Sequence, residues 1–598
     1  MSAAPPPAPE TNPSGAGTMS PRALFYEFFW THRRRYIPGF LLLGLTNILA
    51  LAIPRFLKHA VEALQAVDRR GLVIFSAAIA AAAIGQAVIR TWSRLLILGA
   101  CRHVVYELRG RLFGHLQLLP LSWYGKQSIG DITSRAINDM MLVRSLFGFG
   151  LMNLVNTGLV YATALAMMLV IDVRLTLTAL APYPFFIFAV NRLSRRVYQH
   201  TLSVQDQMAA LTGRAQETIS GINLIKTFAR EDAESETWDA MSRDYLDRSL
   251  ALARARGAMV PLMGIMASTG TLVVVGLGGA AVIAGRISLG DFVAFSAYLA
   301  YLIWPTLAFG WLLNTFQRGA AALRRIAELL RQPEEERDLP PGEADRLEGT
   351  IAFRNLTFAH TGAPAGREQL AGIDLEVPAG SSLGVLGTVG SGKSTLTSFL
   401  TRINPPPAGT VLIDGMDVNA IPLAVLRRDV IMVPQESLLF SRTLRENLTL
   451  ADAQSDPARV DEAARASRLA NDLPQLPAGL DTMVGERGVT LSGGQRQRAT
   501  IARALLADPR VLVLDDAFSS LDAEVERDVV EEIRRRSAGL TTIVISNRVA
   551  SLSWADRIIV MDDGRIIERG THDELLAADG LYARIARRQT LVDRLEAS

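Results

Sequence analysis

Cysteine and lysine are scarce in this chain of 598 residues, and each scarcity is informative. The single cysteine, Cys101, excludes an internal disulfide and any zinc site built from several cysteines. Lysine occurs only at Lys58, Lys126, Lys226 and Lys393, so nearly every basic residue is arginine, which indicates a GC-rich genome. The formal net charge is only +3, and with so small a basic excess we expect no nucleic-acid partner.

Apolar sequence, in contrast, is abundant. Hydrophobic residues make up 49% of the chain, which is high for a soluble protein. They concentrate in six segments, each long enough for a helix to cross a bilayer: residues 37–63, 71–98, 145–171, 173–192, 257–284 and 291–317. Burying all six in a soluble core would require a core larger than one domain supports. We therefore predict six transmembrane helices.

The connections between these segments alternate in length. Two long polar connections, after the second and the fourth segments, are rich in arginine, so the positive-inside rule places them and both termini in the cytoplasm. Arg69 and Arg70 run against this rule, because they fall in a predicted outer loop. Each long connection is expected to be helical with a break, near residues 120–125 and 211–214. The breaks are either surface turns or short helices that contact a cytoplasmic domain.

Two arginines lie inside the second segment. Arg90 and Arg94 could line a cavity and bind an anionic group, or their side chains could snorkel to the membrane surface. Arg90 lies about twenty residues from the outer end of its segment, close to the inner interface, which favours snorkelling. No residue of the six segments identifies a substrate.

A phosphate-binding loop dominates the second half of the chain. Its spacing is G-x-x-x-x-G-K-S, between an apolar run at 382–386 that predicts a buried strand and residues 396–400, which continue as a helix. Backbone N–H groups of such a loop surround nucleotide phosphates, the lysine reaches the β- and γ-phosphates, and the serine offers its hydroxyl to Mg²⁺. A plain glycine-rich turn would not require the lysine–serine pair, so we predict ATP and Mg²⁺ binding. The loop residues are Gly387, Thr388, Val389, Gly390, Ser391, Gly392, Lys393, Ser394 and Thr395.

Three further motifs follow the phosphate loop. Gln435 comes after an apolar strand, where its amide can reach the metal or an attacking water. Leu491 precedes Ser492, Gly493, Gly494 and Gln495, which open a helix over 496–506 and present backbone donors suited to a second phosphate site. The apolar run 511–515 predicts a buried strand that ends in Asp515, an acid placed for Mg²⁺.

From about residue 22 onward, the chain resembles ATP-binding cassette (ABC) transporters, specifically exporter half-transporters. The phosphate loop and LSGGQ, about a hundred residues apart, are a specific pair. The resemblance implies a membrane α-helical domain of six transmembrane helices fused to an α/β P-loop nucleotide-binding domain. It also implies that two such domains sandwich ATP between the phosphate loop of one chain and the LSGGQ of the other. Gln435 then corresponds to the Q-loop glutamine, Asp515 to the Walker B aspartate, Asp522 to the D-loop, and the two breaks to coupling helices.

Composition and the resemblance together predict four parts of the chain. We expect a disordered N-terminus at 1–20, a transmembrane domain at 21–330, a linker at 331–348 and the nucleotide-binding domain at 349–598. By the same resemblance, residues 482–486 correspond to the segment that contacts the transmembrane helices.

Three positions depart from the family pattern. Asp516 stands where the family usually has the glutamate that acts as general base, and its carboxylate is withdrawn by roughly 1 Å. Asn547 replaces the switch histidine and cannot carry a positive charge near the γ-phosphate. His360 replaces the aromatic residue that stacks on adenine, and an imidazole stacks less extensively.

These departures predict a site that binds ATP and hydrolyses it slowly, beside an intact LSGGQ that serves a partner chain. We expect the degenerate subunit of a heterodimeric exporter, with a second ABC half-transporter as partner. Its expected substrates are amphipathic drugs, lipids or peptides, and its expected location is the bacterial inner membrane with the nucleotide-binding domain in the cytoplasm. The alternative is an ATP-gated channel or regulatory subunit that binds nucleotide without pumping.

Overall fold

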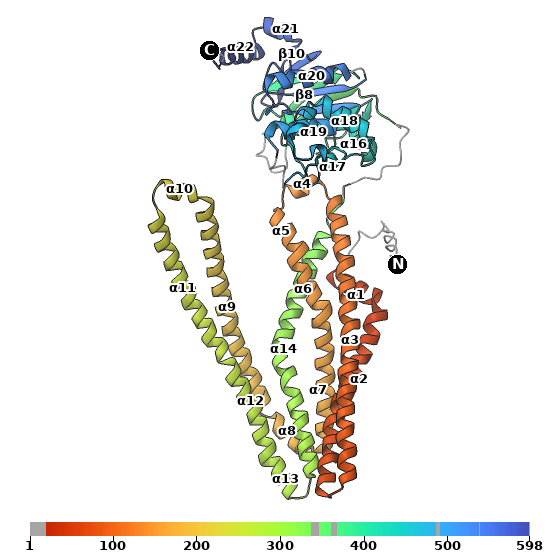
Figure 1. The fold of residues 1–598 in the computed structure, drawn as a ribbon, viewed down its shortest axis with the longest axis vertical. Helices are drawn as coiled ribbons and strands as arrows, with labels where there is room; N and C mark the ends of the chain where they lie inside the picture. Colours follow the sequence, from red (N-terminus) through yellow and green to blue (C-terminus); the bar gives the residue numbers. More distant parts are fainter. Residues whose placement is uncertain (1–19, 336–345, 360–367, 486–490, 537–538, 597–598) are drawn as a thin grey trace. The chain divides into compact units, whose positions relative to one another are not determined.

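The structure is a computed structural model that describes residues 20–335, 346–359, 368–485, 491–536 and 539–596. The chain divides into two compact units (Figure 1). Residues up to 118 and residues 127–333 form unit 1, and residues 119–126 and 334–598 form unit 2. The expected disordered N-terminus (through residue 19), most of the expected linker, His360 and Glu486 lie outside the described residues.

Unit 1 is entirely helical in its described part. Three short π-helical turns, η1, η2 and η3, interrupt its helices. The elements are α1 (Pro21–Thr31), α2 (Arg33–Gln65), α3 (Arg69–Leu118), α5 (Ile129–Ser134), η1 (Arg135–Asp139), α6 (Met140–Ser145), η2 (Leu146–Gly150), α7 (Leu151–Ile171), α8 (Val173–Leu180), α9 (Tyr183–Ser220), α10 (Ile222–Thr227), α11 (Glu231–Gly257), α12 (Met259–Val273), η3 (Val274–Gly278), α13 (Gly279–Ile283) and α14 (Leu289–Leu329).

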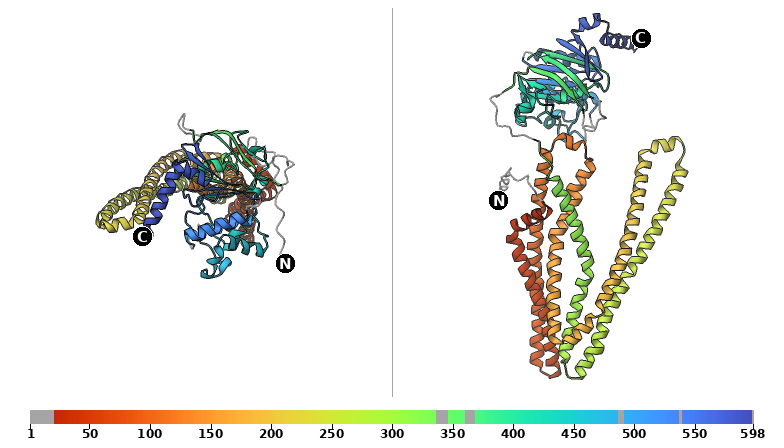
Figure 2. Two further views of the ribbon diagram at one scale, coloured as in Figure 1. Left: turned by 90° about the horizontal axis from the view of Figure 1, so that it is seen from above. Right: turned by 180° about the vertical axis from the view of Figure 1, so that it is seen from behind.

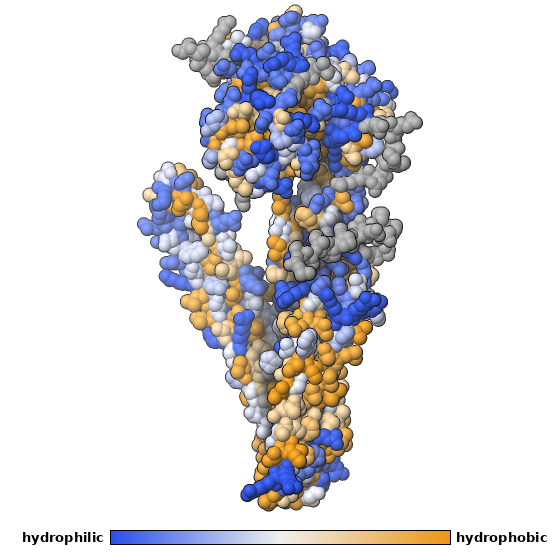
Figure 3. Space-filling view, turned by 45° about the vertical axis from the view of Figure 1, so that its right-hand side comes forward, coloured by the Kyte–Doolittle hydropathy of each residue, from blue (hydrophilic) through white to orange (hydrophobic). Residues whose placement is uncertain are grey.

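The described chain contains six helical stretches long and apolar enough to cross a membrane, which confirms the predicted fold class of this half. They are Arg33–Gln65, Arg69–Leu118, Ile129–Ile171, Val173–Ser220, Glu231–Ile283 and Leu289–Leu329. Large apolar side chains on their outer surfaces are exposed, for example Leu41 and Val170, and Figure 3 shows apolar residues covering much of the lower part of unit 1. Such a surface suits lipid rather than water.

Several of these helices are much longer than a bilayer requires. The 50 residues of α3 extend over about 75 Å, compared with about 30 Å of hydrocarbon. Helices α9 and α11 run side by side as an antiparallel hairpin that ends in α10 (Figures 1 and 2). The long polar connections of the sequence are therefore continuations of the transmembrane helices.

One predicted break is found and the other is misplaced. The first break is the short helix α4 (Leu121–Tyr124), which Pro120 and Gly125 bound. The second was expected at 211–214, but α9 runs through these residues and ends at Gly221. Gly213 has open space around it, and a single exposed glycine costs a 38-residue helix only about 1 kcal/mol. Glycine composition alone therefore gave the wrong position.

Unit 2 is an α/β domain with two sheets. The strands are β1 (Ile351–Phe358), β2 (Leu370–Val377), β3 (Ser382–Gly387), β4 (Val411–Ile413), β5 (Met416–Asp417), β6 (Val430–Val433), β7 (Val511–Asp515), β8 (Thr541–Ile545), β9 (Arg557–Asp562) and β10 (Arg565–Gly570). The smaller sheet has the order β2-β1-β4-β5, and the larger has the order β10-β9-β3-β8-β7-β6. Apolar side chains of β1–β4 and of the larger sheet share one buried core.

Helices surround the larger sheet and form a separate helical cluster. Besides α4, they are α15 (Lys393–Ser398), α16 (Leu423–Asp429), α17 (Leu444–Leu448), α18 (Pro457–Ala466), α19 (Gly493–Leu506), α20 (Ala523–Arg536), α21 (His572–Ala577) and α22 (Leu581–Glu596), with 3₁₀ turns η4 (Val418–Ala420), η5 (Leu469–Asn471), η6 (Leu473–Gln475) and η7 (Gly479–Asp481). Residues of α17, α18 and α19 pack around their own core, and α20 and α22 pack against the sheet.

Candidate functional site

The predicted site residues gather at one edge of the larger sheet. Strands β3, β8, β7 and β6 are neighbours and run parallel, so their carboxyl ends lie at the same edge. The phosphate loop follows β3, Asn547 follows β8, Asp515 ends β7 and Asp516 comes directly after it, and Gln435 follows β6. This edge is where open α/β sheets bind ligands. Sheet topology therefore brings together residues that are 160 positions apart in the chain.

The phosphate loop has the backbone that only its glycines permit. Gly390 and Gly392 have φ values of +87° and +92°, which residues with side chains rarely adopt. A Cβ at Gly392 would lie 2.7 Å from the carbonyl oxygen of Gln369, whereas the position at Gly390 is open. Ser391 between them is buried and Val389 is exposed. The loop thus leaves its backbone accessible around Gly390.

Lys393, the first residue of α15, curls back over the loop. Its Nζ donates to the carbonyl oxygens of Gly387 at 2.8 Å and Thr388 at 2.7 Å. Burial lowers the pKa of Lys393, although Asp515 and Asp516 act in the opposite direction. The ammonium group is therefore held beside the loop and two carboxylates.

The acidic residues at the end of β7 differ in environment. Asp515 is buried and accepts a hydrogen bond from the Ser394 hydroxyl. Burial raises the pKa of Asp515, and the nearby Asp516 adds to this shift. Asp516 is half-buried, and Gln435 Nε2 lies 3.4 Å from its Oδ2. Lys393, Ser394, Asp515, Asp516 and Gln435 therefore form one connected group.

The backbone at Asp516 is itself unusual. Its φ of +49° lies in the left-handed region, where aspartate and asparagine are the most tolerated residues after glycine. The Asp516 N–H donates to the carbonyl oxygen of Ile545 at 2.9 Å, which ties the residue to the end of β8. The position of this carboxylate is therefore fixed by the sheet.

Asn547 lies two residues after β8, and its side chain is exposed. Its neighbours are anchored: Ser546 is buried, and its N–H donates to the carbonyl oxygen of Val385 at 3.3 Å. The side chain of Asn547 therefore projects from a loop whose base is held in the sheet.

The LSGGQ residues form the start of α19, three residues earlier than the sequence predicted. Ser492 is the N-cap: its Oγ accepts from the Gln495 N–H at 3.2 Å, and its own N–H donates to Gln495 Oε1 at 3.0 Å. This capping box satisfies two of the free N-terminal amides. The segment also packs against the D-loop, because a Cβ at Gly494 would lie 3.0 Å from the carbonyl oxygen of Ser520.

Gln497 strengthens the contact between α19 and the D-loop. Its amide donates to Ser519 Oγ and accepts from the Ser520 N–H, both at 2.8 Å. Asp522 follows directly and precedes α20. The signature segment and the D-loop thus behave as one rigid surface, and these hydrogen bonds join the two segments to each other.

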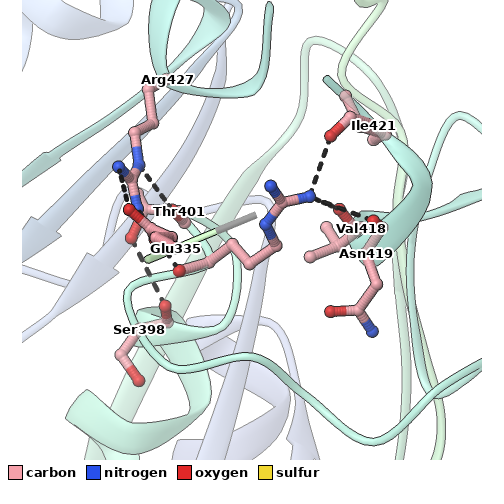
Figure 4. Close-up of polar contacts among 8 residues, drawn as sticks. Glu335, Ser398, Thr401, Val418, Asn419, Ile421 and Arg427 are labelled. Carbon is pink, nitrogen blue, oxygen red and sulfur yellow. Dashed lines mark hydrogen bonds and ion pairs between the residues drawn. The ribbon is translucent and has the colours of Figure 1, made fainter. Parts of the chain in front are cut away.

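The far end of the phosphate-loop helix is anchored by two arginines. The buried Arg402 donates from Nη1 to the carbonyl oxygens of Asn419 at 3.1 Å and Ile421 at 3.0 Å. Arg427 donates from Nε to the carbonyl oxygen of Thr401 at 3.3 Å and pairs with Glu335, with Nη2 2.7 Å from Oε1 (Figure 4). Charge-assisted bonds of this kind resist displacement, so the helix that carries Lys393 and Ser394 has a fixed base.

These residues fit ATP with Mg²⁺. The open backbone at Gly390 and the lysine beside it suit phosphate oxygens, and Ser394 and Asp515 supply the hard oxygen ligands that Mg²⁺ prefers. The metal would neutralise phosphate charge during hydrolysis. Asp516 and Gln435 lie beside each other at the same edge of the sheet, with Gln435 Nε2 3.4 Å from Asp516 Oδ2.

Comparisons with known proteins agree with this geometry. Residues 36–306 match the family model "ABC transporter transmembrane region", and residues 370–519 match the model "ABC transporter". The chain is 33% identical to the Bacillus subtilis protein titled "Probable multidrug resistance ABC transporter ATP-binding/permease protein YheI", over 95% of this chain and 97% of that protein. It is 34% identical to an ATP-dependent lipid A-core flippase of Photobacterium profundum, over 81% and 83% of the two chains.

A solved structure extends the likeness to the fold. A bacterial Atm1-family ABC exporter with ATP bound matches with a TM-score of 0.75 and 28% sequence identity, over 93% of this chain and 98% of the other.

Proposed function

The chain belongs to the ABC transporter family, as an ATP-driven exporter whose transmembrane region and ATP-binding domain are fused, and we propose that it is the degenerate-site subunit of a heterodimer. The observation that carries this proposal is the pairing of Asp516 and Asn547 with an otherwise complete site. Lys393, Ser394 and Asp515 retain the residue types that hold phosphate and Mg²⁺. The two changed residues are those that act on the attacking water and the γ-phosphate.

The geometry supports slow hydrolysis at this site. Asp516 is held by its backbone bond to Ile545, so the shorter side chain cannot be offset by a shift of the strand end. A general base must reach its proton within about 3 Å, and a displacement of 1 Å costs about 10²-fold. Asn547 is neutral at every pH and supplies no charge to the γ-phosphate.

The signature segment supports an active partner site. Ser492, Gly493, Gly494 and Gln495 keep the complete motif, and the capping box and Gln497 hold it in place. We propose that these residues, together with Asp522 of the D-loop, complete the ATP site of the partner chain. His360, which we propose as the adenine-facing residue, would weaken stacking at the chain's own site.

Exposed apolar residues at the ends of the long helices support a role for α4 and α10 in coupling ATP hydrolysis to movement of the transmembrane helices. Ile219, Leu224 and Phe228 at the tip of the α9–α11 hairpin are exposed, although they lie far from the apolar segments in sequence. The ATP-binding domain has an apolar cavity of about 200 Å³ lined by β6, Leu438, Leu450 and α19. We propose that α4 and α10 act as coupling helices that contact such surfaces.

We propose amphipathic drugs, lipids or peptides as substrates, moved outward across a bacterial inner membrane, with the ATP-binding domain in the cytoplasm. The names of the relatives support this class, since one is called a probable multidrug resistance ABC transporter protein and another an ATP-dependent lipid A-core flippase.

We expect a partner half-transporter that has glutamate and histidine at the positions of Asp516 and Asn547, and a damaged LSGGQ. The altered residues of the partner would complement those of this chain, because each ATP site takes residues from both chains. The measurement is purification of the tagged chain from its native membrane, followed by mass spectrometry and sequencing of co-purified subunits. A transport-active complex that contains this chain alone would contradict the heterodimer.

We expect the reconstituted complex to move an amphipathic fluorescent probe against its gradient in vesicles, at the expense of ATP. The channel alternative also binds ATP, but a channel can only dissipate a gradient set in advance. The control is the same complex with Lys393→Met here and the equivalent change in the partner, which should bind ATP poorly at both sites. Probe movement that stops when the gradient is dissipated would favour the channel.

A further inference from the structure

A glutamine of helix α22 forms two hydrogen bonds with the loop that carries Asn547. Gln589 lies on α22, which packs against the larger sheet. Its Nε2 donates to the carbonyl oxygen of Asn547 at 2.6 Å, and its Oε1 accepts from the Val549 N–H at 2.8 Å. The side-chain amide therefore pairs with the Asn547 carbonyl and the Val549 N–H, the two backbone groups on either side of Arg548, much as the backbone of an adjacent strand would.

The opposite side of the same loop is tied to α20. Glu526, a buried residue in the first turn of that helix, accepts from Arg548 Nη1 at 3.0 Å and also from the Ser551 hydroxyl. The Glu526 N–H in turn donates to the carbonyl oxygen of Asp522 at 2.9 Å. Loop residues 547–551 therefore lie between two clamps, one from α20 and one from α22.

The two clamps differ in what they hold. Glu526 binds side chains that follow Asn547 and not the peptide between Asn547 and Arg548, whose N–H donates to Ser546 Oγ at 3.0 Å. Gln589 binds the Asn547 carbonyl itself, and the orientation of that peptide sets where the Asn547 side chain projects. Because the planar Gln589 amide makes both hydrogen bonds, it fixes the direction of the Asn547 carbonyl as well as its distance from α22.

We propose that Gln589 is a positioning residue for nucleotide discrimination: by fixing the Asn547 backbone, the C-terminal helix α22 determines how well the site distinguishes ATP from ADP. This inference rests on the proposed function, in which Asn547 faces the γ-phosphate. Gln589 touches no nucleotide in this scheme and acts only through Asn547.

The test uses the full-length chain in detergent and compares its affinities for a non-hydrolysable ATP analogue and for ADP. The variants are Gln589→Met, which keeps length and helix propensity but forms neither bond, Asn547→Ala, and the double variant. We expect Gln589→Met to lower the ratio of ATP-analogue to ADP affinity by about three- to tenfold, as the loss of one or two hydrogen bonds allows, with ADP affinity unchanged. In the Asn547→Ala background the same change should have no further effect.

Thr590→Ala is the matched control, since Thr590 is an exposed neighbour on α22 whose hydroxyl bonds only within its own helix. A fall in affinity for both nucleotides, or a Gln589→Met effect that persists without the Asn547 side chain, would show a merely structural role and overturn the inference. Faster hydrogen exchange at the Val549 amide would verify that the clamp has opened.

The outcomes also separate the inference from the proposed function. An unchanged ratio in Gln589→Met, with a lowered ratio in Asn547→Ala, overturns the inference and leaves the function intact. An unchanged ratio in Asn547→Ala overturns the inference as well, because Gln589 would then have nothing to act through. Only retention of nucleotide binding in Lys393→Met would refute the nucleotide site itself.

Discussion

Gly493→Asp should nearly abolish ATP hydrolysis by the assembled transporter, whereas Asp516→Asn should hardly change it. In the proposed dimer Gly493 faces the triphosphate bound to the partner, where an added carboxylate repels the phosphates. Two like charges about 4 Å apart interact by about 4 kcal/mol at an effective dielectric of 20, which corresponds to about a thousandfold in rate. Steady-state ATPase measurements on the reconstituted complex would check both variants.

The structure supplies a control for the signature substitution. A Cβ at Gly493 would lie 3.4 Å from the Ser520 side chain, which is ordinary contact, so Gly493→Ala should lose far less activity than Gly493→Asp. A carboxylate at the start of α19 interacts favourably with the helix dipole, so the loss of ATPase activity in Gly493→Asp would not reflect unfolding of the helix. If Asp516→Asn proved the more damaging change, the chain's own phosphate loop would supply the turnover.

Restoring both altered residues, Asp516→Glu with Asn547→His, should raise hydrolysis at the chain's own site by roughly 10²–10⁴-fold, the usual contribution of a general base. Either change alone should do less, because the base and the γ-phosphate contact act as a unit. Glutamate must also adopt the left-handed backbone at position 516, which it tolerates less well than aspartate, so the gain should fall toward the lower end.

Single-turnover hydrolysis of nucleotide trapped in this site would measure the gain, in a complex whose partner has its catalytic glutamate changed to glutamine. The unmodified site should keep its nucleotide through several cycles of the other site, because its phosphate and Mg²⁺ contacts remain. Turnover as fast as that of a normal site would refute the degenerate-site proposal. No gain from the double change would point to a further defect, such as the partner's signature segment.

The chemistry of the site could be predicted from the sequence because its functional residues lie in short, contiguous motifs. Gly390 and Gly392 belong to a glycine-rich loop between a strand and a helix, an arrangement that few functions other than phosphate binding require. The apolar run that ends in Asp515 was recognisable as a buried strand. Their assembly at one sheet edge follows from parallel strand order. That order could not be read from the spacing of the motifs, and the structure supplies it.

Other features depend on tertiary contacts and left no local signal. The end of α9 at Gly221 rather than near Gly213 is decided by the hairpin that α9 forms with α11, since both glycines look alike in sequence. Gln589 was missed because a glutamine in an amphipathic helix is unremarkable until the loop it bonds lies beside it. The positive φ of Asp516 was equally invisible, although an aspartate after a strand is compatible with it.

The lysine at the phosphate loop has a consequence for chemical reactivity. Lys393 is the only lysine between residues 227 and 598, and its lowered pKa makes the free amine more available at neutral pH than on an ordinary lysine. Arginine, which carries the rest of the positive charge, does not react with acylating reagents under the same conditions. Amine-directed acylation of this half of the chain therefore falls on the nucleotide site alone, and a bound triphosphate would shield it. The scarcity of lysine makes nucleotide occupancy readable as a single mass shift on one peptide.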